Sequence, residues 1–329
     1  MVGKRVPDLT INEERLNLLA QVAHMYYEEE MTQQQISVQL GYSRSAISRL
    51  LTEARRAGVV EIRIYHPLAR NAALEQELRE RFSLREARVL TPGPLPYHKL
   101  LRRLGEVAAR LLETVVKHNS VIGVSWGTSV YEVANALRPP HYPNVTVVQL
   151  IGALGTADPQ IDGPELARWF ARKYGGRYYT LPTPLVVENA AIRDALMNDR
   201  HVRDVLDKAR QVDVAIVGIG STDPSISSLV RAGYMDIEEV RSIANTGAVG
   251  DICSLHFDIN GALMPGLPVS QRTVGVQEDV LHNIPIVLGV AGGEIKAPAM
   301  LGALRSGLLD ILITDDLAAR RVVELCNSR

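Results

Sequence analysis

The chain has 329 residues, of which 46% are hydrophobic and 22% are charged. This ordinary globular balance predicts one large domain and a small one, or two medium domains. The formal net charge of -1 does not indicate a nucleic-acid-binding protein, so any DNA-binding surface has to be local. Cys253 and Cys326 lie far apart and have no Cys or His nearby at ligand spacing, which argues against a disulfide framework or a zinc site.

No uninterrupted apolar run is long enough to span a bilayer. The first nine residues carry Lys4, Arg5 and Asp8 with no apolar run behind them, so they do not form a signal peptide. We therefore expect a reduced, soluble, cytoplasmic protein with no membrane partner.

Two Thr-x-x-Glu/Gln capping boxes mark helix starts near the N-terminus, at Thr10 and at Thr32. The first predicts an amphipathic helix whose buried side is formed by Leu16, Leu19, Ala20, Ala23 and Tyr27. The second predicts a short helix that buries Ile36 and Leu40 and ends at Gly41.

Ser43 is a favourable N-cap for a third helix. Its apolar residues recur at i, i+3, i+4 and i+7 and predict one buried stripe, formed by Ile47, Leu50, Leu51 and Ala54. Gly58 ends this helix, and residues 59–64 alternate like a strand, as in a winged domain. Two helices joined by a glycine turn are typical of a helix-turn-helix.

The exposed side of the third helix offers short polar side chains and arginines, the groups that reach base edges and phosphates in the major groove. Lys plus Arg equals Asp plus Glu over residues 1–66, yet residues 32–63 hold five arginines against two glutamates. The alternative is a three-helix bundle used for protein contacts, with solvated arginines. We predict a DNA-binding surface formed by Gln33, Arg44, Ser45, Ser48, Arg49 and Thr52.

We place the helix-turn-helix domain at 1–66, a linker or oligomerisation segment at 67–90 and an effector domain at 91–329. The charged helical stretch at 73–82 either connects domains, pairs subunits or is a solvated helix. The effector domain alternates continuously apolar strands with amphipathic helices, which predicts a Rossmann-like parallel sheet covered on both faces. The predicted strands are 120–124, 145–150, 212–217, 286–290 and 311–314, and the predicted helices are 130–137, 165–174, 297–305 and 317–325.

Ligands bind such sheets at the carboxyl ends of the strands. The predicted strand at 120–124 leads into Ser125, Gly127, Thr128 and Ser129, where hydroxyls and the N–H groups of a helix start suit a phosphate. A tight turn with Thr128 as N-cap is the equal alternative.

Two further loops are candidates for the same edge. Gly292 and Gly293 permit close approach of a ligand, and Lys296 follows at a helix start, although a lysine there is usually a surface residue. Asp251, within 247–252, is placed either to accept hydrogen bonds from sugar hydroxyls or to form a turn.

Nucleotide-binding glycine signatures, a Ser–His–Asp set and His–Glu metal spacing are missing, so we expect no cofactor and no metal. His256, beside Phe257, is interpreted as a satisfied core or loop histidine. One alternative function stays open: a sugar-phosphate isomerase, aldolase or deaminase with Lys296 or Asp251 as the catalytic residue and an accessory helical domain. The fused helix-turn-helix favours a regulator over that enzyme.

Several sequence segments of the chain resemble the SorC family of sugar-responsive transcription regulators. The resemblance covers nearly the whole length and is carried by Met31 to Ile36, Leu40 to Leu51, Gly123 to Thr128, Val147 to Leu150, Gly247 to Ile252, Ala291 to Lys296 and Leu312 to Asp316. It implies an effector domain similar to sugar-phosphate isomerases and deaminases, with a phosphate on Ser125 to Ser129 opposite the glycine pair and Lys296.

The resemblance also implies homo-oligomers, often tetramers, that bind operator DNA under the control of a small, phosphorylated sugar. It adds Gly152 to the effector-binding residues. One departure concerns Ile151, which stands where a polar residue such as Asn or Arg is expected to contact the sugar. The sequence therefore predicts a regulator of a carbohydrate-catabolism operon without naming the sugar.

Overall fold

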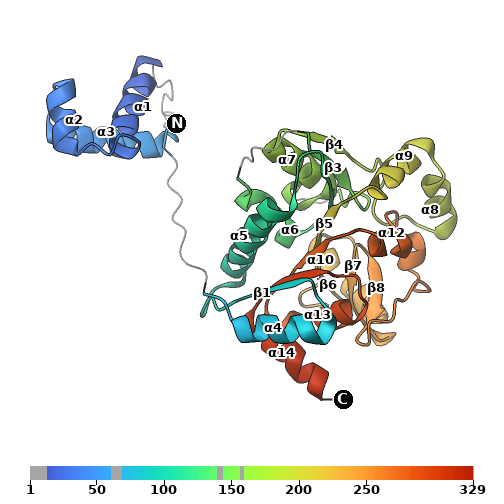
Figure 1. Cartoon of the computed structure of the whole chain (residues 1–329). Helices are drawn as coiled ribbons and strands as arrows, with labels where there is room; N and C mark the ends of the chain where they lie inside the picture. The colour runs from blue at the N-terminus through green and yellow to red at the C-terminus, as the bar shows by residue number, and fades with distance from the viewer. Residues whose placement is uncertain (1–12, 61–68, 139–143, 156–158, 329) are drawn as a thin grey trace, which may run out of the picture. The chain divides into compact units, whose positions relative to one another are not determined.

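The computed structural model describes residues 13–60, 69–138, 144–155 and 159–328. Its contacts divide the chain into two compact units, Met1–Pro67 and Leu68–Arg329 (Figure 1). The predicted capping box at Thr10 and most of the predicted strand at 59–64 lie outside the described residues.

The N-terminal unit contains α1 (Glu13–Tyr27), α2 (Gln33–Leu40) and α3 (Arg44–Arg56). The second capping box is confirmed: the Thr32 side chain accepts from the Gln35 N–H, and the Gln35 side chain accepts from the Thr32 N–H. Gly41 ends α2 with a φ of 72°, a left-handed conformation that glycine adopts at low cost. Ser43 caps α3 as predicted, through the Ala46 N–H at 3.2 Å.

The core of this unit is small and comes from all three helices. On α3 the predicted buried stripe is confirmed residue for residue: Ile47, Leu50, Leu51 and Ala54. On α1 the predicted side was partly wrong, because Leu16, Ala20 and Tyr27 are exposed. Leu19 and Ala23 are buried as predicted, and Val22 and Met25 are buried in addition. Both sides of α1 carry apolar residues, and contact with α3 selects one of them.

The larger unit is built on a seven-stranded, fully parallel sheet in the order β1-β10-β9-β5-β2-β3-β4. The five predicted strands correspond to β2 (Val121–Val124), β3 (Thr146–Gln149), β5 (Val214–Gly218), β9 (Val287–Val290) and β10 (Ile311–Asp315). The edge strands β1 (Glu86–Leu90) and β4 (Arg177–Tyr179) were not predicted. Both carry half-exposed or exposed polar side chains, so they lack the continuous apolar run of a central strand.

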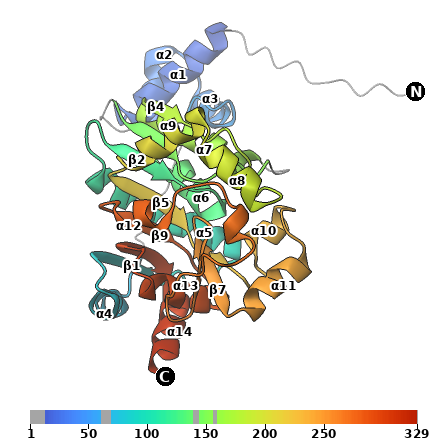
Figure 2. The same ribbon diagram turned by 90° about the vertical axis from the view of Figure 1, so that its right-hand side faces the viewer.

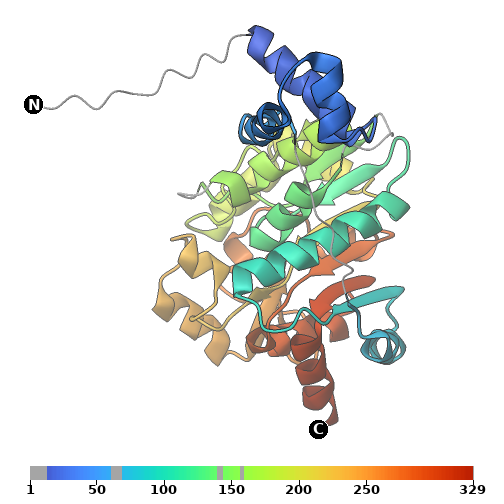
Figure 3. The ribbon, with the colours of Figure 1, turned by 90° about the vertical axis from the view of Figure 1, so that its left-hand side faces the viewer.

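Helices cover both faces of this sheet, as predicted. One face packs against α5 (Tyr97–Val115), α6 (Thr128–Ala136) and α7 (Gly163–Tyr174) (Figure 3). The other face packs against α4 (Ala72–Phe82), α9 (Arg200–Ala209), α12 (Glu278–His282), α13 (Ala297–Arg305) and α14 (Asp316–Asn327). The short helix α8 (Ala190–Met197) precedes α9.

The segment 67–90 is not a separate linker over its described part. Its helix α4 packs Leu74 and Leu78 into the core, and β1 pairs with β10 through five residue pairs from Glu86 to Leu90. The buried Glu75 carboxylate ties the two together by accepting from the Val89 N–H at 2.9 Å and pairing with Arg70. Residues 69–90 therefore belong to the larger unit, and the expectation of a linker there is corrected.

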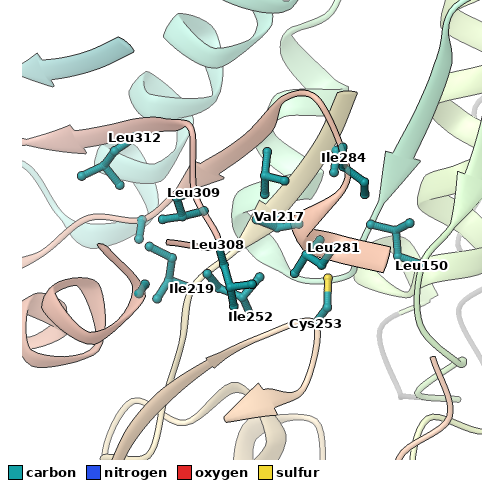
Figure 4. Packing of buried hydrophobic residues seen from close by; sticks show 14 of the residues in the cluster. Leu150, Val217, Ile219, Ile252, Cys253, Leu281, Ile284, Leu308, Leu309 and Leu312 are labelled. Carbon is teal, nitrogen blue, oxygen red and sulfur yellow. The ribbon is translucent and has the colours of Figure 1, made fainter. Parts of the chain in front are cut away.

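A second, three-stranded antiparallel sheet lies beside the large one: β6 (Gly220–Ser221), β7 (Ala248–Ile252) and β8 (Leu255–Asp258). Figure 2 shows β7 close to α10 (Ser228–Arg231) and α11 (Ile237–Asn245). Ile252 and Cys253, at the tip of the β7–β8 hairpin, pack among Leu150, Val217 and other buried residues of the large sheet and its helices (Figure 4). The expectation that 247–252 is a loop at the end of a parallel strand was wrong, because residues 248–252 form β7.

Candidate effector pocket and DNA-binding surface

A pocket opens between β2 and β5, where the chain changes the side of the large sheet to which it adds successive strands. From β2 the chain proceeds outward to β3 and β4, whereas from β5 it proceeds the other way to β9 and β10. The neighbouring strands β2 and β5 therefore form the switch point at which α/β proteins bind ligands, outside the carboxyl ends of the strands. The pocket has an empty volume of about 760 Å³, its open mouth included, and residues that follow both strands line it.

The loop after β2 supplies hydrogen-bond donors to the pocket. Ser125, Gly127, Thr128 and Ser129 all line it. The N-cap of α6 is Gly127, with no side-chain capping bond, so the alternative of Thr128 as N-cap does not hold. The first N–H groups of a helix have no partner inside the helix and carry partial positive charge. This end of the pocket is suited to an anion.

Lys296 supplies a cation from the short turn η3 (Glu294–Lys296) after β9. Its side chain is buried, with 6% exposed, and Nζ donates to the Ile219 carbonyl at 2.6 Å. Burial lowers the pKa of Lys296 to about 8; Asp251 nearby opposes this shift and Arg231 adds to it. Lys296 forms no ion pair with any residue that the structure describes, so its charge is incompletely compensated.

Asp251 lines the same pocket from β7 and supplies acceptor oxygens. Gly220 stands opposite it on β6. A Cβ at Gly220 would lie 1.9 Å from Asp251 Oδ1, so only glycine leaves room for the carboxylate there. The structure thus brings Asp251, Lys296 and the loop of Ser125–Ser129 to one cavity.

Three predicted effector-binding residues do not line the pocket. Gly152 lies where a Cβ would be 2.4 Å from the Pro184 carbonyl oxygen, so it serves close backbone packing. A Cβ at Gly292 would approach Leu104 and Asp315 within 2.7 Å. The Gly293 N–H donates to Asp315 Oδ1 at 2.6 Å. The glycine pair therefore shapes the turn that places Lys296. Next to Gly152, the apolar side chain of Ile151 lines the pocket.

Sequence reasoning missed several pocket residues, Arg231 and Tyr97 above all. Arg231 ends α10, a four-residue helix with no strand-end or glycine signal before it. Tyr97 begins α5, directly after the Pro-rich loop, and burial raises its pKa while Arg231 lowers it. Arg231 therefore lies close enough to act on both Tyr97 and Lys296, and it brings a second cation to the pocket.

In the N-terminal unit the predicted DNA-binding residues lie on α3, except Gln33, which begins α2. Arg44, Ser45, Ser48 and Arg49 are exposed, and Gln33 and Thr52 are half-buried. The Thr52 hydroxyl donates to the Ser48 carbonyl at 3.0 Å, so it keeps only its acceptor capacity for DNA. Arg15 of α1 pairs with Glu53, which removes the one acidic side chain of α3 from competition with phosphate.

The described residues contain no group of three or more His, Cys, Asp or Glu placed to hold a metal ion. Among the helices of the described chain, none is both long and apolar enough to cross a membrane.

Each of the two units matches a known protein family. Residues 66–324 match the family described as "Putative sugar-binding domain", and residues 20–57 match sigma-70 region 4. The chain is 32% identical over 313 residues to the deoxyribonucleoside regulator of Bacillus subtilis (strain 168), covering 95% of this chain and 99% of that protein. It is 31% identical over 307 residues to the sorbitol operon regulator of Klebsiella pneumoniae, covering 92% and 96%. The crystal structure of full-length SorC from Klebsiella pneumoniae matches with a TM-score of 0.74 and 30% identity, covering 94% of this chain and 99% of that one.

A helix-turn-helix joined to an α/β unit with a ligand pocket defines a DNA-binding regulator controlled by a small molecule. The chain belongs to the SorC family of sugar-binding transcriptional regulators. The predicted family, fold class and regulatory function are confirmed, and its relatives are named regulators rather than enzymes. The isomerase, aldolase or deaminase alternative is not favoured.

Proposed function

We propose that the effector is a phosphorylated sugar and that it binds in the pocket at the carboxyl ends of β2 and β5. The observation that carries this proposal is Lys296, a buried ammonium without an ion-pair partner in the described chain, facing the same cavity as the uncapped start of α6. A phosphate would accept from the α6 N–H groups and the Thr128 hydroxyl and would compensate the charge of Lys296. Asp251 would accept from sugar hydroxyls.

Isothermal titration with pairs of sugar phosphates and their unphosphorylated parents tests this assignment. Thr128→Ala and Lys296→Ala should each weaken the phosphorylated form much more than its parent. Asp251→Asn should weaken both forms alike, because its proposed contacts are hydroxyls. Normal affinity in all three variants would place the effector site elsewhere.

We further propose that operator DNA is read by α3, with Arg44, Ser45, Ser48 and Arg49 in the major groove and Gln33 and Thr52 at its edge. The exposed polar side of α3, opposite a fully buried apolar stripe, supports this placement.

The three-helix unit offers one reading helix per chain. A homodimer or homotetramer that spans two half-sites would therefore provide the affinity for DNA that a single unit lacks. Light scattering of the purified chain measures this state, and a monomer would contradict it.

A sensor returns its effector unaltered. Phosphorus and carbon NMR of a sugar phosphate kept with the protein for hours should show reversible binding and no product. Steady multiple turnover would contradict the regulatory function proposed for the pocket.

A further inference from the structure

The β7–β8 hairpin presents two side chains next to each other on the pocket wall. Asp251 and His256 are direct partners in the antiparallel ladder, so they point to the same face with Cβ atoms about 5 Å apart. Both line the effector pocket. The row continues on β6 with Gly220, whose missing side chain leaves the space in front of Asp251 open.

A hydrogen bond to the backbone decides which ring nitrogen of a neutral His256 carries the hydrogen. The side chain is 3% exposed, and Nδ1 lies 3.1 Å from the carbonyl oxygen of Ser254. A carbonyl only accepts, so Nδ1 carries the hydrogen and donates it; the Ser270 hydroxyl lies 3.4 Å from the same nitrogen. A neutral imidazole then has an unprotonated Nε2, which is an acceptor. Within the described part of the chain nothing donates to Nε2.

Ser254 orients both acceptors at once. Its carbonyl accepts from His256 Nδ1, and its N–H donates to Asp251 Oδ2 at 3.1 Å. Ser254 and Cys253 both have left-handed φ values, of 61° and 51°, and Cys253 is packed in the core beside Ile252 and Leu281 (Figure 4). The tip is thereby held in place, and the two acceptors are positioned before any ligand arrives.

We propose that His256 is a further effector-binding residue, whose Nε2 accepts a hydrogen bond from a hydroxyl of the sugar next to the hydroxyl that Asp251 reads. This inference rests on the proposed function of the pocket. It specifies the effector further: a sugar phosphate with two neighbouring free hydroxyls, because a sugar lacking one of them would leave one of the two acceptors in the pocket without a donor. His256 thus selects the hydroxyl pattern, whereas Lys296 and the start of α6 select the phosphate.

A neighbouring cavity supplies the control. His256 and Cys253 also border this second cavity, which is lined in addition by Gln271, Gln277 and Met264. Gln271 is exposed and lines only the second cavity, so Gln271→Ala tests whether a ligand seated there accounts for any effect of His256.

The experiment compares two variants of similar polarity. His256→Asn keeps a donor for the Ser254 carbonyl but removes the atom that reaches the pocket, whereas His256→Gln restores an acceptor at about the reach of Nε2. Ribose 5-phosphate, glucose 6-phosphate, fructose 6-phosphate and sorbitol 6-phosphate are titrated into the wild type. The tightest of them is then compared with its monodeoxy analogues in every variant, and thermal melting and operator binding without sugar check that each variant folds.

In the wild type, removal of one particular hydroxyl should weaken binding about tenfold. His256→Asn should bind the parent sugar phosphate about tenfold more weakly and no longer distinguish that analogue, and His256→Gln should recover most of the discrimination. Gln271→Ala should behave as the wild type. If His256→Asn does not fold, His256→Phe is measured in its place, with the same expectation.

Unchanged discrimination in the variant that lacks the acceptor would overturn the inference, as would an equal loss for the parent and all analogues. Loss of discrimination in Gln271→Ala would move the contact to the second cavity and overturn it too. If the wild type binds none of the four sugar phosphates, the proposed function itself is contradicted, and the inference with it.

Discussion

The N-terminal unit and the effector pocket use positive charge in opposite ways. Arg44 and Arg49 on α3 lie in water and have no ion-pair partner among the described residues, whereas Lys296 is buried and its pKa is lowered to about 8. Exposed charges attract DNA over a distance and are screened by salt. A desolvated charge acts at contact and is screened little. Exposed arginines and a buried lysine are thus two physically different ways of presenting positive charge to an anionic ligand.

The largest expected difference between the two regions is in how salt changes their binding affinities. Operator affinity should fall about a thousandfold between 50 and 200 mM salt, because the cations of an oligomer displace several counterions from DNA. Affinity for the sugar phosphate should change only a few-fold over the same range. Fluorescence anisotropy with labelled operator and calorimetry with the sugar phosphate measure the two responses; equal salt slopes would abolish the contrast.

Replacing Lys296 by methionine should weaken sugar-phosphate binding about a hundredfold, because a phosphate would be left unpaired in a buried site. The same change should stabilise the unliganded protein. Removing the desolvated ammonium should raise the free energy of unfolding by about 3 kcal/mol. Losing the hydrogen bond to the Ile219 carbonyl should lower it by about 1 kcal/mol. We expect a rise in melting temperature of several degrees, measured by calorimetry without sugar. A drop in stability would mean that Lys296 is a structural residue.

Arg49→Ala should weaken operator binding about tenfold or more, because a base contact is worth about 1–3 kcal/mol. Sugar-phosphate affinity should stay unchanged. Arg320, exposed on α14 of the larger unit, provides the matched control: Arg320→Ala removes the same charge and should leave operator affinity as it was. An equal loss in both variants would show a general charge effect rather than a reading helix.

The smallest expected effect is the pH dependence of the affinity for the sugar phosphate. Below pH 8 Lys296 is charged both free and bound, so affinity for the sugar phosphate should be flat down to about pH 6, near the second phosphate pKa. Above pH 8 the free protein loses a proton that the complex has to regain, and affinity should fall by up to about tenfold per pH unit. Lys296→Met should lack this slope in calorimetric titrations. A slope that persists in the variant would assign it to another group.

Local signals made the N-terminal unit largely predictable. Caps at Thr32 and Ser43 and the stripe on α3 depend on residues within a few positions of each other, and the structure confirms them. The buried side of α1 could not be read in the same way, because both sides are apolar and packing against α3 decides between them. The predicted wing strand stays a prediction.

Apart from Asp251, which lies in β7, the predicted residues that line the pocket follow the ends of parallel strands. Ser125–Ser129 and Lys296 follow central apolar strands, so their positions followed from the parallel sheet. Arg231 and Tyr97 come to the cavity from a short helix and a helix start, and only tertiary structure brings them there. The sequence favours a satisfied core or loop histidine at His256, because its partner Asp251 lies five positions away across a hairpin too short to be predicted.

A sugar phosphate in the pocket is proposed to control operator binding. Operator sites selected from random duplex DNA can be labelled and titrated with the wild type and Lys296→Met, with and without a saturating sugar phosphate. We predict equal operator affinity for both proteins without sugar, a change of about tenfold or more for the wild type with sugar, and no response in Lys296→Met. An operator affinity that is the same with and without bound sugar phosphate in the wild type would contradict the account.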